Sequence, residues 1–290
     1  MNVKKAVIPA AGMGTRFLPV TKSMPKEMLP LVDTPAIHYV VKEAIDAGIE
    51  DIIIITGRRK RAVEDYFDES PELEMHLKEK EKHDLLDVVE EISSMVNVHY
   101  IRQKEPKGLP DAILQAEKHV DDEPFAVLLG DDIIKSEIPC IAQLIDVYSE
   151  FEKSVLAVQR VPLKHISRYG AVKAEPVSSM GDHNVFEILD VVEKPDPSVA
   201  PSDLAAIGRY VFTPGIFDCI RKTPLSINNE SVIADSIMIL KKQQSIFATE
   251  FDGKRYDIGD KLGYVEAIID FALEKQDIAD DLRLFLKDFC

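Results

Sequence analysis

Short apolar runs rich in valine and isoleucine recur along the first half of the chain, separated by stretches with helical periodicity. They predict strands at residues 4–9, 51–56, 97–102, 124–129 and 154–160. Continuous apolar runs of this length are typical of parallel strands that are buried on both faces. The alternation over residues 1–160 therefore predicts a doubly wound, Rossmann-like α/β sheet, whose ligands bind at the carboxyl ends of the strands.

Apolar residues at helical spacing fill the intervals between these strands. Ile37, Val40, Val41 and Ala44 form one such stripe, and Gly48 follows it as a helix stop. A second stripe runs from residue 141 to residue 151, after Pro139.

The second half of the chain is less regular. It predicts strands at about 170–174, 185–193, 205–213 and 246–251, and helices near 231–243 and 261–275. No internal repeat or low-complexity linker divides the chain. We therefore expect a single α/β domain over residues 1–290, in which the later strands extend the first sheet as a mixed sheet.

Two amphipathic segments lie outside this pattern. One is an acidic helical stretch at residues 71–96, with an apolar stripe at Leu85, Val88, Val89, Ile92 and Met95. The other is a C-terminal helix at residues 276–290, with its stripe at Ile278, Leu282, Phe285, Leu286 and Phe289. We expect each stripe to pack on the chain's own body, and a contact with a second subunit is the alternative.

The charge balance limits the possible partners. With 35 basic and 51 acidic residues the chain has a formal net charge of −16, which argues against binding to nucleic acid or to an anionic membrane. Residues 1–26 are the exception, since they contain five basic residues and no acidic one.

Three cysteines, Cys140, Cys219 and Cys290, are widely spaced, so neither a disulfide framework nor a zinc site is indicated. Pro9 and Gly12 interrupt the first apolar run too early for a signal peptide, and no stretch approaches the roughly 20 apolar residues that span a bilayer. We expect a cytoplasmic protein.

The most informative stretch is residues 6–31, AVIPAAGMGTRFLPVTKSMPKEMLPL. A buried strand ends at Pro9, and a turn of small residues follows, where backbone N–H groups can approach a phosphate closely. The third glycine of the dinucleotide fingerprint is missing, and Thr15 and Arg16 take its place, with Lys26 ten residues further on. These cations favour a polyphosphate ligand over a nicotinamide dinucleotide.

Carboxylates follow two other strands. Asp131 and Asp132 end the apolar run VLLGDD, and Asp257 lies between a strand and a helix in KRYDIGDKLGY. Aspartate is also common as a helix cap or turn former. Oxygen ligands at this edge of the sheet suit Mg²⁺, and the two segments together could hold one metal-bound nucleotide.

Glu193 and Lys194 adjoin at the end of a predicted strand in VVEKP. Adjacent residues of a strand point to opposite faces, so an ion pair between them is not expected. Taken alone, Glu193 and Lys194 are best interpreted as two exposed, solvated side chains. The alternative is that the chain turns at the strand end and directs both side chains into one cleft.

The sequence contains no nucleophile motif of the G-x-S-x-G kind, no Cys–His pairing and no H-E-x-x-H metal spacing. Attack by a phosphate oxygen on another phosphate needs neither a protein nucleophile nor a strong base, because the attacking oxygen is already ionised. Such a reaction needs alignment and charge neutralisation, which metal, lysine and arginine supply.

The segments AAGMGTRFLP and MPKEMLPLVDTP resemble the signature of the sugar nucleotidyltransferases, and within them the prokaryotic uridylyltransferase group. VVEKP, APSDLAAIGRYVF and YDIGDKLGY follow in the family's order, so the likeness runs nearly end to end. The resemblance implies that the enzyme joins UTP and glucose 1-phosphate to give UDP-glucose and pyrophosphate with Mg²⁺. It also implies a nucleotide-binding half at 1–160, a sugar-binding half at 161–275 and a homodimer or homotetramer.

The resemblance further implies site residues. Nucleotide contacts fall to Ala10, Ala11, Gly12, Gly14 and Thr15, and uracil contacts to Glu27, Gln103 and Gly108. Arg16 and Lys26 would hold the departing pyrophosphate, and Asp131 and Asp257 the Mg²⁺. The sugar site would comprise Gly170, Glu193 and Gly208, with Lys194 on the sugar phosphate. The catalytic set is Arg16, Lys26, Asp131 and Lys194.

The chain departs from the family pattern at residues 108–112, where GLPDA replaces GLGHA. Pro110 removes a backbone donor beside the expected base site, which affects the detail of uracil contact more than the reaction.

Three other functions are weighed. A thymidylyltransferase is the nearest, because thymine presents the same hydrogen-bonding edge as uracil. A catalytically silent nucleotide-sugar sensor would have lost Asp131 or Lys194, and both are present. A nicotinamide-dependent oxidoreductase does not fit the glycine pattern.

Overall fold

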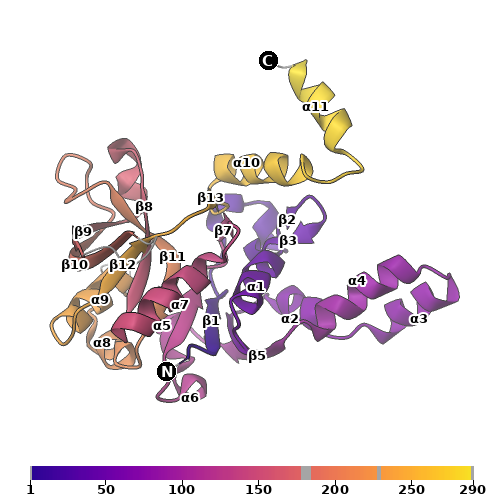
Figure 1. Cartoon of the computed structure of the whole chain (residues 1–290). Helices are drawn as coiled ribbons and strands as arrows, with labels where there is room; N and C mark the ends of the chain where they lie inside the picture. The colour runs from indigo at the N-terminus through magenta and orange to yellow at the C-terminus, as the bar shows by residue number, and fades with distance from the viewer. Residues whose placement is uncertain (1, 178–183, 227–229, 289–290) are drawn as a thin grey trace.

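A computed structural model describes residues 2–177, 184–226 and 230–288. In these residues the core is a nine-stranded sheet in the order β5-β4-β1-β6-β11-β8-β12-β10-β9 (Figure 1). All nine strands fall at the predicted positions. Their bounds are β1 (Lys5–Pro9), β4 (Asp51–Thr56), β5 (Asn97–Arg102), β6 (Phe125–Leu128), β8 (Val155–Arg160), β9 (Gly170–Pro176), β10 (Asn184–Glu193), β11 (Leu204–Phe212) and β12 (Phe247–Glu250).

The first four strands form the parallel half of the sheet. β1 pairs in parallel with β4 and with β6, and β4 pairs in parallel with β5. This is the order of a Rossmann half, and it confirms the α/β prediction.

The second half of the sheet is mixed. β11 runs antiparallel to β6 and to β8, and β10 runs antiparallel to β12 and to β9. An added pairing of Ala205 with Ala171 joins β11 directly to β9, so the sheet curls back on itself at this end. The predicted mixed extension is therefore confirmed.

Helices cover both faces. On one face, buried side chains of α1 (Ala36–Asp46) and α7 (Cys140–Phe151) belong to one hydrophobic cluster with Ile8 and Ile54. On the other face, α5 (Leu109–Leu114), α8 (Ile216–Lys222) and α9 (Ile233–Lys241) pack in a second cluster. Ile37, Val40, Val41 and Ala44 are all buried, as their spacing predicts.

Two short strands, which the sequence did not predict, tie the end of the chain to its middle. β7 (Asp132–Lys135) pairs antiparallel with β13 (Lys254–Asp257), and Asp132 lies opposite Asp257. Their sequences, DIIK and KRYD, are neither continuous apolar runs nor alternating ones, so no local pattern predicts these strands. β2 (Pro30–Leu31) and β3 (Thr34–Pro35) form a second small pair.

The remaining helices lie toward the periphery. They are α2 (Arg61–Phe67), α3 (Pro71–Glu79), α4 (His83–Ser94), α6 (Glu117–Val120), α10 (Lys261–Ala272) and α11 (Ala279–Lys287). Single turns of 3-10 helix occur at Thr15–Phe17, Val20–Lys22 and Lys26–Met28, and a longer one at Leu163–Arg168. None of the helices in the described residues is long and apolar enough to cross a bilayer.

Residues 71–94 form a hairpin of two helices, α3 and α4, that projects from the body (Figure 1). The hairpin buries Leu77 and Leu86, whereas Leu85 and Val88 of the predicted stripe are more than half exposed. The expectation that this stripe packs on the chain's own body is therefore wrong at Leu85 and Val88. Only the end of α4, at Ile92, packs against the main core.

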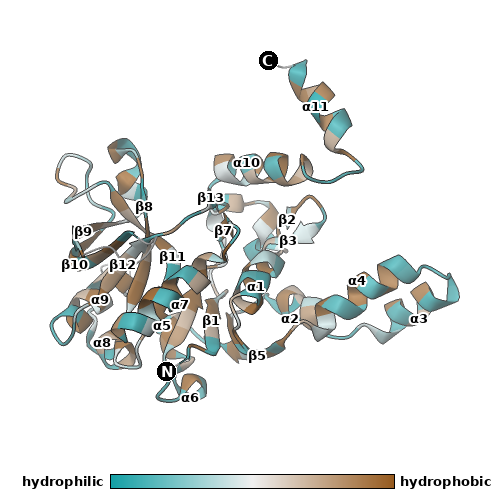
Figure 2. Ribbon diagram, viewed as in Figure 1, coloured by the Kyte–Doolittle hydropathy of each residue, from teal (hydrophilic) through white to brown (hydrophobic). Residues whose placement is uncertain are grey.

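The C-terminal helix α11 lies beyond α10, away from the sheet (Figure 1). Leu284 and Phe285 are more than half exposed, so the expected packing of this stripe on the body is wrong at Phe285. Figure 2 shows brown apolar positions interspersed with teal on α11 and on the hairpin. The predicted stripe residue Phe289 lies outside the described residues.

Candidate active site

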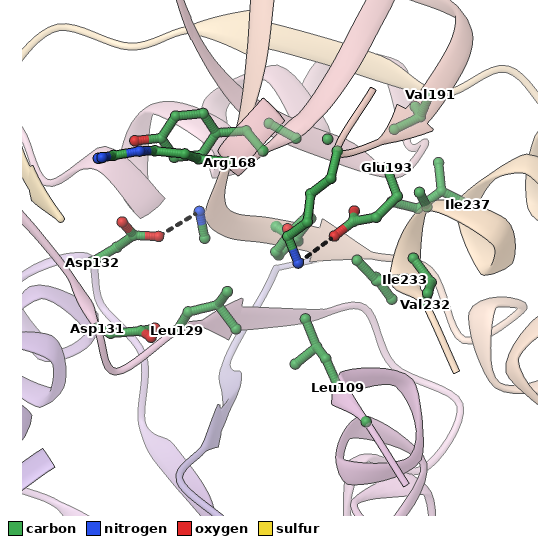
Figure 3. A pocket seen from close by; sticks show the side chains of 18 of the residues that line it. Leu109, Leu129, Asp131, Asp132, Arg168, Val191, Glu193, Val232, Ile233 and Ile237 are labelled. Carbon is green, nitrogen blue, oxygen red and sulfur yellow. Dashed lines mark hydrogen bonds and ion pairs between the residues drawn. The ribbon is translucent and has the colours of Figure 1, made fainter. Parts of the chain in front are cut away.

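A cavity of about 560 Å³ opens at the carboxyl end of β6, between the two halves of the sheet. Asp131 and Asp132 lie on one side, Glu193, Val232 and Ile233 on the other, and Leu109 lies below them (Figure 3). Its position is the one that the sequence predicts for a ligand site in an open α/β sheet. The predicted site residues that line it are Arg16, Gly108, Asp131, Gly170, Glu193, Lys194, Gly208 and Asp257.

We name Asp131, Asp132, Arg255 and Asp257 the carboxylate wall. Arg255 Nε donates to Asp132 Oδ1 at 2.6 Å, and its guanidinium lies 3.7 Å from Asp257. The guanidinium also covers the ring of Tyr169 at 4.9 Å. The side chains of Arg255 and Asp132 are both less than one-tenth exposed, and the nearby carboxylates outweigh burial and raise the pKa of Arg255. Water therefore barely reaches the Arg255–Asp132 pair at the centre of this wall, whereas the Asp131 side chain is one-third exposed.

Asp131 and Asp257 converge on one space beside Gly259. A Cβ at Gly259 would lie 3.0 Å from Asp131 Oδ2 and 3.2 Å from Asp257 Oδ1. Burial raises the pKa of Asp257, which a cation would reverse. Two hard oxygen ligands fit Mg²⁺, which keeps water and phosphate as its other ligands. No group of three or more metal-ligating side chains occurs in the described residues, so a bound ion would depend on ligand oxygens.

Lys26 and Arg16 reach the carboxylate wall from the start of the chain. Lys26 Nζ donates to Asp131 Oδ2 at 2.7 Å, and Arg16 Nη1 donates to the carbonyl of Gly259 at 3.4 Å. Burial alone would raise the pKa of Asp131, but the Lys26 ammonium outweighs it and lowers that pKa. The predicted cations and the predicted metal ligands are therefore neighbours.

The glycine turn leaves donors available. The backbone N–H groups of Ala11, Gly12 and Gly14 have no hydrogen-bond partner among the described residues. Gly14 has φ 65°, and a Cβ there would lie 3.1 Å from Lys26 Cβ. Ala10 differs, because its N–H already donates to Ile55 O at 2.9 Å. A phosphate bound at this turn would therefore meet the N–H groups after Ala10, and Thr15 begins the next helical turn.

We name Tyr169, Gly170, Glu193 and Lys194 the Glu193 wall. Lys194 Nζ lies 3.1 Å from Glu193 Oε1, so the expectation of no ion pair between these neighbours is wrong. The reason is that Lys194 has φ 44°, which ends the strand and turns its side chain toward Glu193. The Lys194 N–H donates to Tyr169 O at 2.9 Å and fixes this turn. Both residues therefore line the cavity, which agrees with the alternative that the chain turns at the strand end and directs both side chains into one cleft.

Gly208 lies between the two walls, and its lack of a side chain is required there. A Cβ would lie 2.4 Å from Asp132 Oδ2 and 2.7 Å from Leu129 Cβ. The Gly208 N–H already donates to Asp132 Oδ2 at 3.0 Å. Gly208 is thus required by its close packing on Asp132 and Leu129, and its predicted contact with a sugar hydroxyl stays a prediction.

Glu27 and Gln103 lie behind the cavity lining. Glu27 is fully buried, and its Oε2 accepts from Lys60 Nζ at 2.5 Å, while Oε1 has no partner in the described structure. Gln103 Nε2 donates to Asp111 Oδ2 at 2.6 Å and weakly to the carbonyl of Gly108, which lines the cavity. Neither Glu27 nor Gln103 lines the cavity itself.

Pro110 is the second residue of α5. The first N–H groups of a helix have no partner inside the helix, so proline at this position breaks no helical hydrogen bond. Gly108 precedes the helix with φ 95°, and a Cβ there would come within 2.5 Å of the carbonyl of Ser231. The loop is therefore fixed by Gly108 and Pro110 together.

The sequence did not predict four polar residues that belong to the site or support it. Lys60, Asp111 and Arg255 carry no motif signal, and Asp132 was noted only beside Asp131. Each acts through a partner far away in sequence or on another element, such as Asp132, which lies 123 positions from Arg255. The role of these residues is visible only in the contacts that their side chains make in the folded structure.

Comparison with known proteins places the chain among the nucleotidyl transferases. The nucleotidyl transferase family model matches residues 5–273. The UTP–glucose-1-phosphate uridylyltransferase of Bacillus subtilis (strain 168) is 50% identical over 286 residues, 99% of this chain and 97% of that protein.

Solved structures of the same family are also similar to this chain. A UTP-bound UGPase from Acinetobacter baumannii has a TM-score of 0.90 and 37% identity, covering 99% of this chain and all of the other. A UDP-glucose pyrophosphorylase complexed with UDP-glucose has a TM-score of 0.84 and 44% identity, covering 93% and 98%. A putative glucose-1-phosphate thymidylyltransferase from Bacillus anthracis, 24% identical with a TM-score of 0.71 over 91% and 93%, shares the fold. The chain therefore belongs to the nucleotidyl transferase family, with the UTP–glucose-1-phosphate uridylyltransferases among its relatives.

Proposed function

We propose that this protein transfers a uridylyl group from UTP to glucose 1-phosphate, giving UDP-glucose and pyrophosphate. One observation carries the proposal. A single cavity has, on one side, two convergent carboxylates with Lys26 and Arg16 beside them, and on the other the Glu193–Lys194 pair. Relatives named for this reaction match nearly the whole chain.

In this reaction an ionised phosphate oxygen of glucose 1-phosphate attacks the α-phosphorus of UTP. A new P–O bond forms on one face as the bond to pyrophosphate breaks on the other, so no protein nucleophile is needed. The chain's task is to align the two phosphates and to neutralise their charge.

Arg16 and Lys26 bind the departing pyrophosphate, and Lys194 binds the sugar phosphate across the cavity. The free N–H groups after Ala10 hold the nucleotide phosphates. Glu193 accepts hydrogen bonds from glucose hydroxyls, and Gly170 and Gly208 line the sugar site. Asp131 and Asp257 hold Mg²⁺, which when bound neutralises charge on the triphosphate.

Uracil is assigned to the side of the cavity near Gly108, where Gln103 donates to the Gly108 carbonyl, and Glu27 is the third residue assigned to the base. On this assignment residues 1–160 hold the nucleotide and residues 161–275 the sugar. Preference for UTP over dTTP is part of the proposal, because the UTP-named relatives are far more similar than the thymidylyltransferase, whose likeness concerns the fold alone.

The direct test is pyrophosphate release from UTP with Mg²⁺, with and without glucose 1-phosphate, and with dTTP in competition. We expect release only when the sugar phosphate is present. Release from dTTP alone would favour the thymidylyltransferase, and UTP binding without release would favour the sensor.

We also propose a homodimer or homotetramer in the cytoplasm. The exposed apolar side chains of α4 and α11, such as Val88 and Leu284, support a subunit contact. Cys140 and Cys219 are free and buried thiols, which suits a reducing compartment. Light scattering after size-exclusion chromatography would give the mass, and a monomer at micromolar concentration would contradict the oligomer.

A further inference from the structure

The side-chain amide of Gln103 is held in one orientation by Asp111. Its Nε2 donates to Asp111 Oδ2 at 2.6 Å, and the whole residue is buried. An ionised carboxylate can only accept hydrogen bonds. If the amide were reversed, Oε1 would face the carboxylate oxygen at the same short distance, and two acceptors would repel.

The same Nε2 also lies 3.5 Å from another acceptor, the carbonyl oxygen of Gly108. Gln103 Oε1 has no hydrogen-bond partner in the part of the chain that the structure describes. Both partners of Nε2 are thus protein acceptors, which leaves Oε1 as the polar atom of this amide that is open to a further partner. An amide without such a partner can turn by 180° and present a donor instead.

The short helix α5 places the carboxylate. Gly108 and Pro110 set the start of the helix, and Asp111 is its third residue, so its side chain lies over the preceding turn, toward Gln103. The sequence GLPDA has aspartate where the family pattern GLGHA has histidine. A histidine can donate as well as accept and would not fix the amide in one orientation.

We propose that Asp111 is a positioning residue for base selection, which makes Gln103 Oε1 the acceptor for the N3–H of uracil. The inference rests on the proposed function, which assigns Gln103 to the base. Uracil and thymine both carry an N3–H, so this contact does not separate UTP from dTTP. Cytosine carries a lone pair at N3, which would face Oε1 acceptor to acceptor, and CTP is excluded.

The test is the ratio of kcat/KM for UTP to that for CTP in wild type and in Asp111→Asn. The asparagine amide can donate to Gln103 Oε1, so Gln103 can turn and present a donor to cytosine N3. We expect the ratio to fall at least tenfold, about the penalty of one buried unmatched polar contact. The change should appear in KM, with kcat for UTP nearly unchanged, because the base is remote from the reacting phosphate.

Asp281→Asn is the matched control, since it removes an exposed carboxylate from the first turn of α11. It should leave the ratio unchanged. A purely structural role of Asp111 would lower UTP and CTP turnover equally, and an unchanged ratio in folded Asp111→Asn would overturn the inference.

If Asp111→Asn does not fold, Gln103→Met gives the second measurement, because it removes the acceptor itself. We expect the same fall in the ratio, and a wild-type ratio in this variant would also overturn the inference. A wild-type protein inactive with UTP and glucose 1-phosphate is a separate outcome, which refutes the proposed function instead.

Discussion

The two walls of the cavity differ in how their charges are held. In the carboxylate wall, Arg255 and Asp132 are less than one-tenth exposed and are tied to each other. In the Glu193 wall, the Lys194 side chain is 55% exposed and has one ion-pair partner, Glu193, in the described structure. The Arg255–Asp132 pair therefore contributes to the fold, whereas the Glu193–Lys194 pair lies open to a ligand and contributes little to stability.

The origin of each wall explains this difference. The carboxylate wall forms where β7 meets β13, two strands far apart in the chain, so its contacts join distant segments. The Glu193 wall forms where β10 ends beside the start of β9. Its ion pair joins consecutive residues and bridges no distant elements.

Asp131→Asn should have the largest effect. It removes a charged oxygen from the Mg²⁺ site and the partner of Lys26, and we expect kcat/KM to fall about 10³-fold, or roughly 4 kcal/mol of transition-state stabilisation. Circular dichroism should show a folded protein, because Asp131 itself borders the cavity. An unfolded variant would mean that Asp131 has a structural role.

Arg255→Leu should affect stability most. It leaves the buried Asp132 carboxylate without its cation, so we expect the free energy of unfolding to fall by about 3 kcal/mol. Urea denaturation measures it. Lys275→Ala, which breaks an exposed pair with Asp33, is the control and should cost less than about 1 kcal/mol. Equal losses in both variants would remove the distinction between a buried and an open wall.

Lys194→Ala should lower activity without lowering stability, in contrast to Arg255→Leu. We expect kcat/KM for glucose 1-phosphate to fall about 10²-fold, or roughly 2.7 kcal/mol, with unfolding and UTP binding nearly unchanged. Calorimetric titration with UTP and steady-state kinetics measure the two effects. Lys173→Ala, an exposed lysine of β9, should behave as wild type. Near-normal turnover by Lys194→Ala would show that the sugar phosphate binds elsewhere.

Glu193→Gln should have the smallest effect. The amide keeps an oxygen that accepts from sugar hydroxyls, so we expect a rise in KM for glucose 1-phosphate of about tenfold, near 1.4 kcal/mol for one weakened charged hydrogen bond. Stability should change by less than about 0.5 kcal/mol, because Glu193 is only half-buried and its one ion-pair partner in the described structure, Lys194, is exposed. A large loss of stability would place Glu193 with the buried wall.

The sequence by itself determined the strands, the helices on the sheet and the position of the site. Residues 4–9 and 51–56 predict β1 and β4 because a run of buried apolar residues is a local property, readable without knowing the partner strand. The small residues after Pro9 indicate the turn for the same reason.

Only the tertiary structure decided which side chains meet. Lys60 reaches Glu27 and Asp257 reaches Asp131 because chain crossings bring separate elements together, and no local pattern records such a crossing. The turn of Lys194 and the exposure of Leu85 depend on packing in the same way. Periodicity is a short-range property of the sequence. The pairing of charges in the cavity depends instead on the packing of the whole sheet, so only the tertiary structure decided which charged side chains form the site.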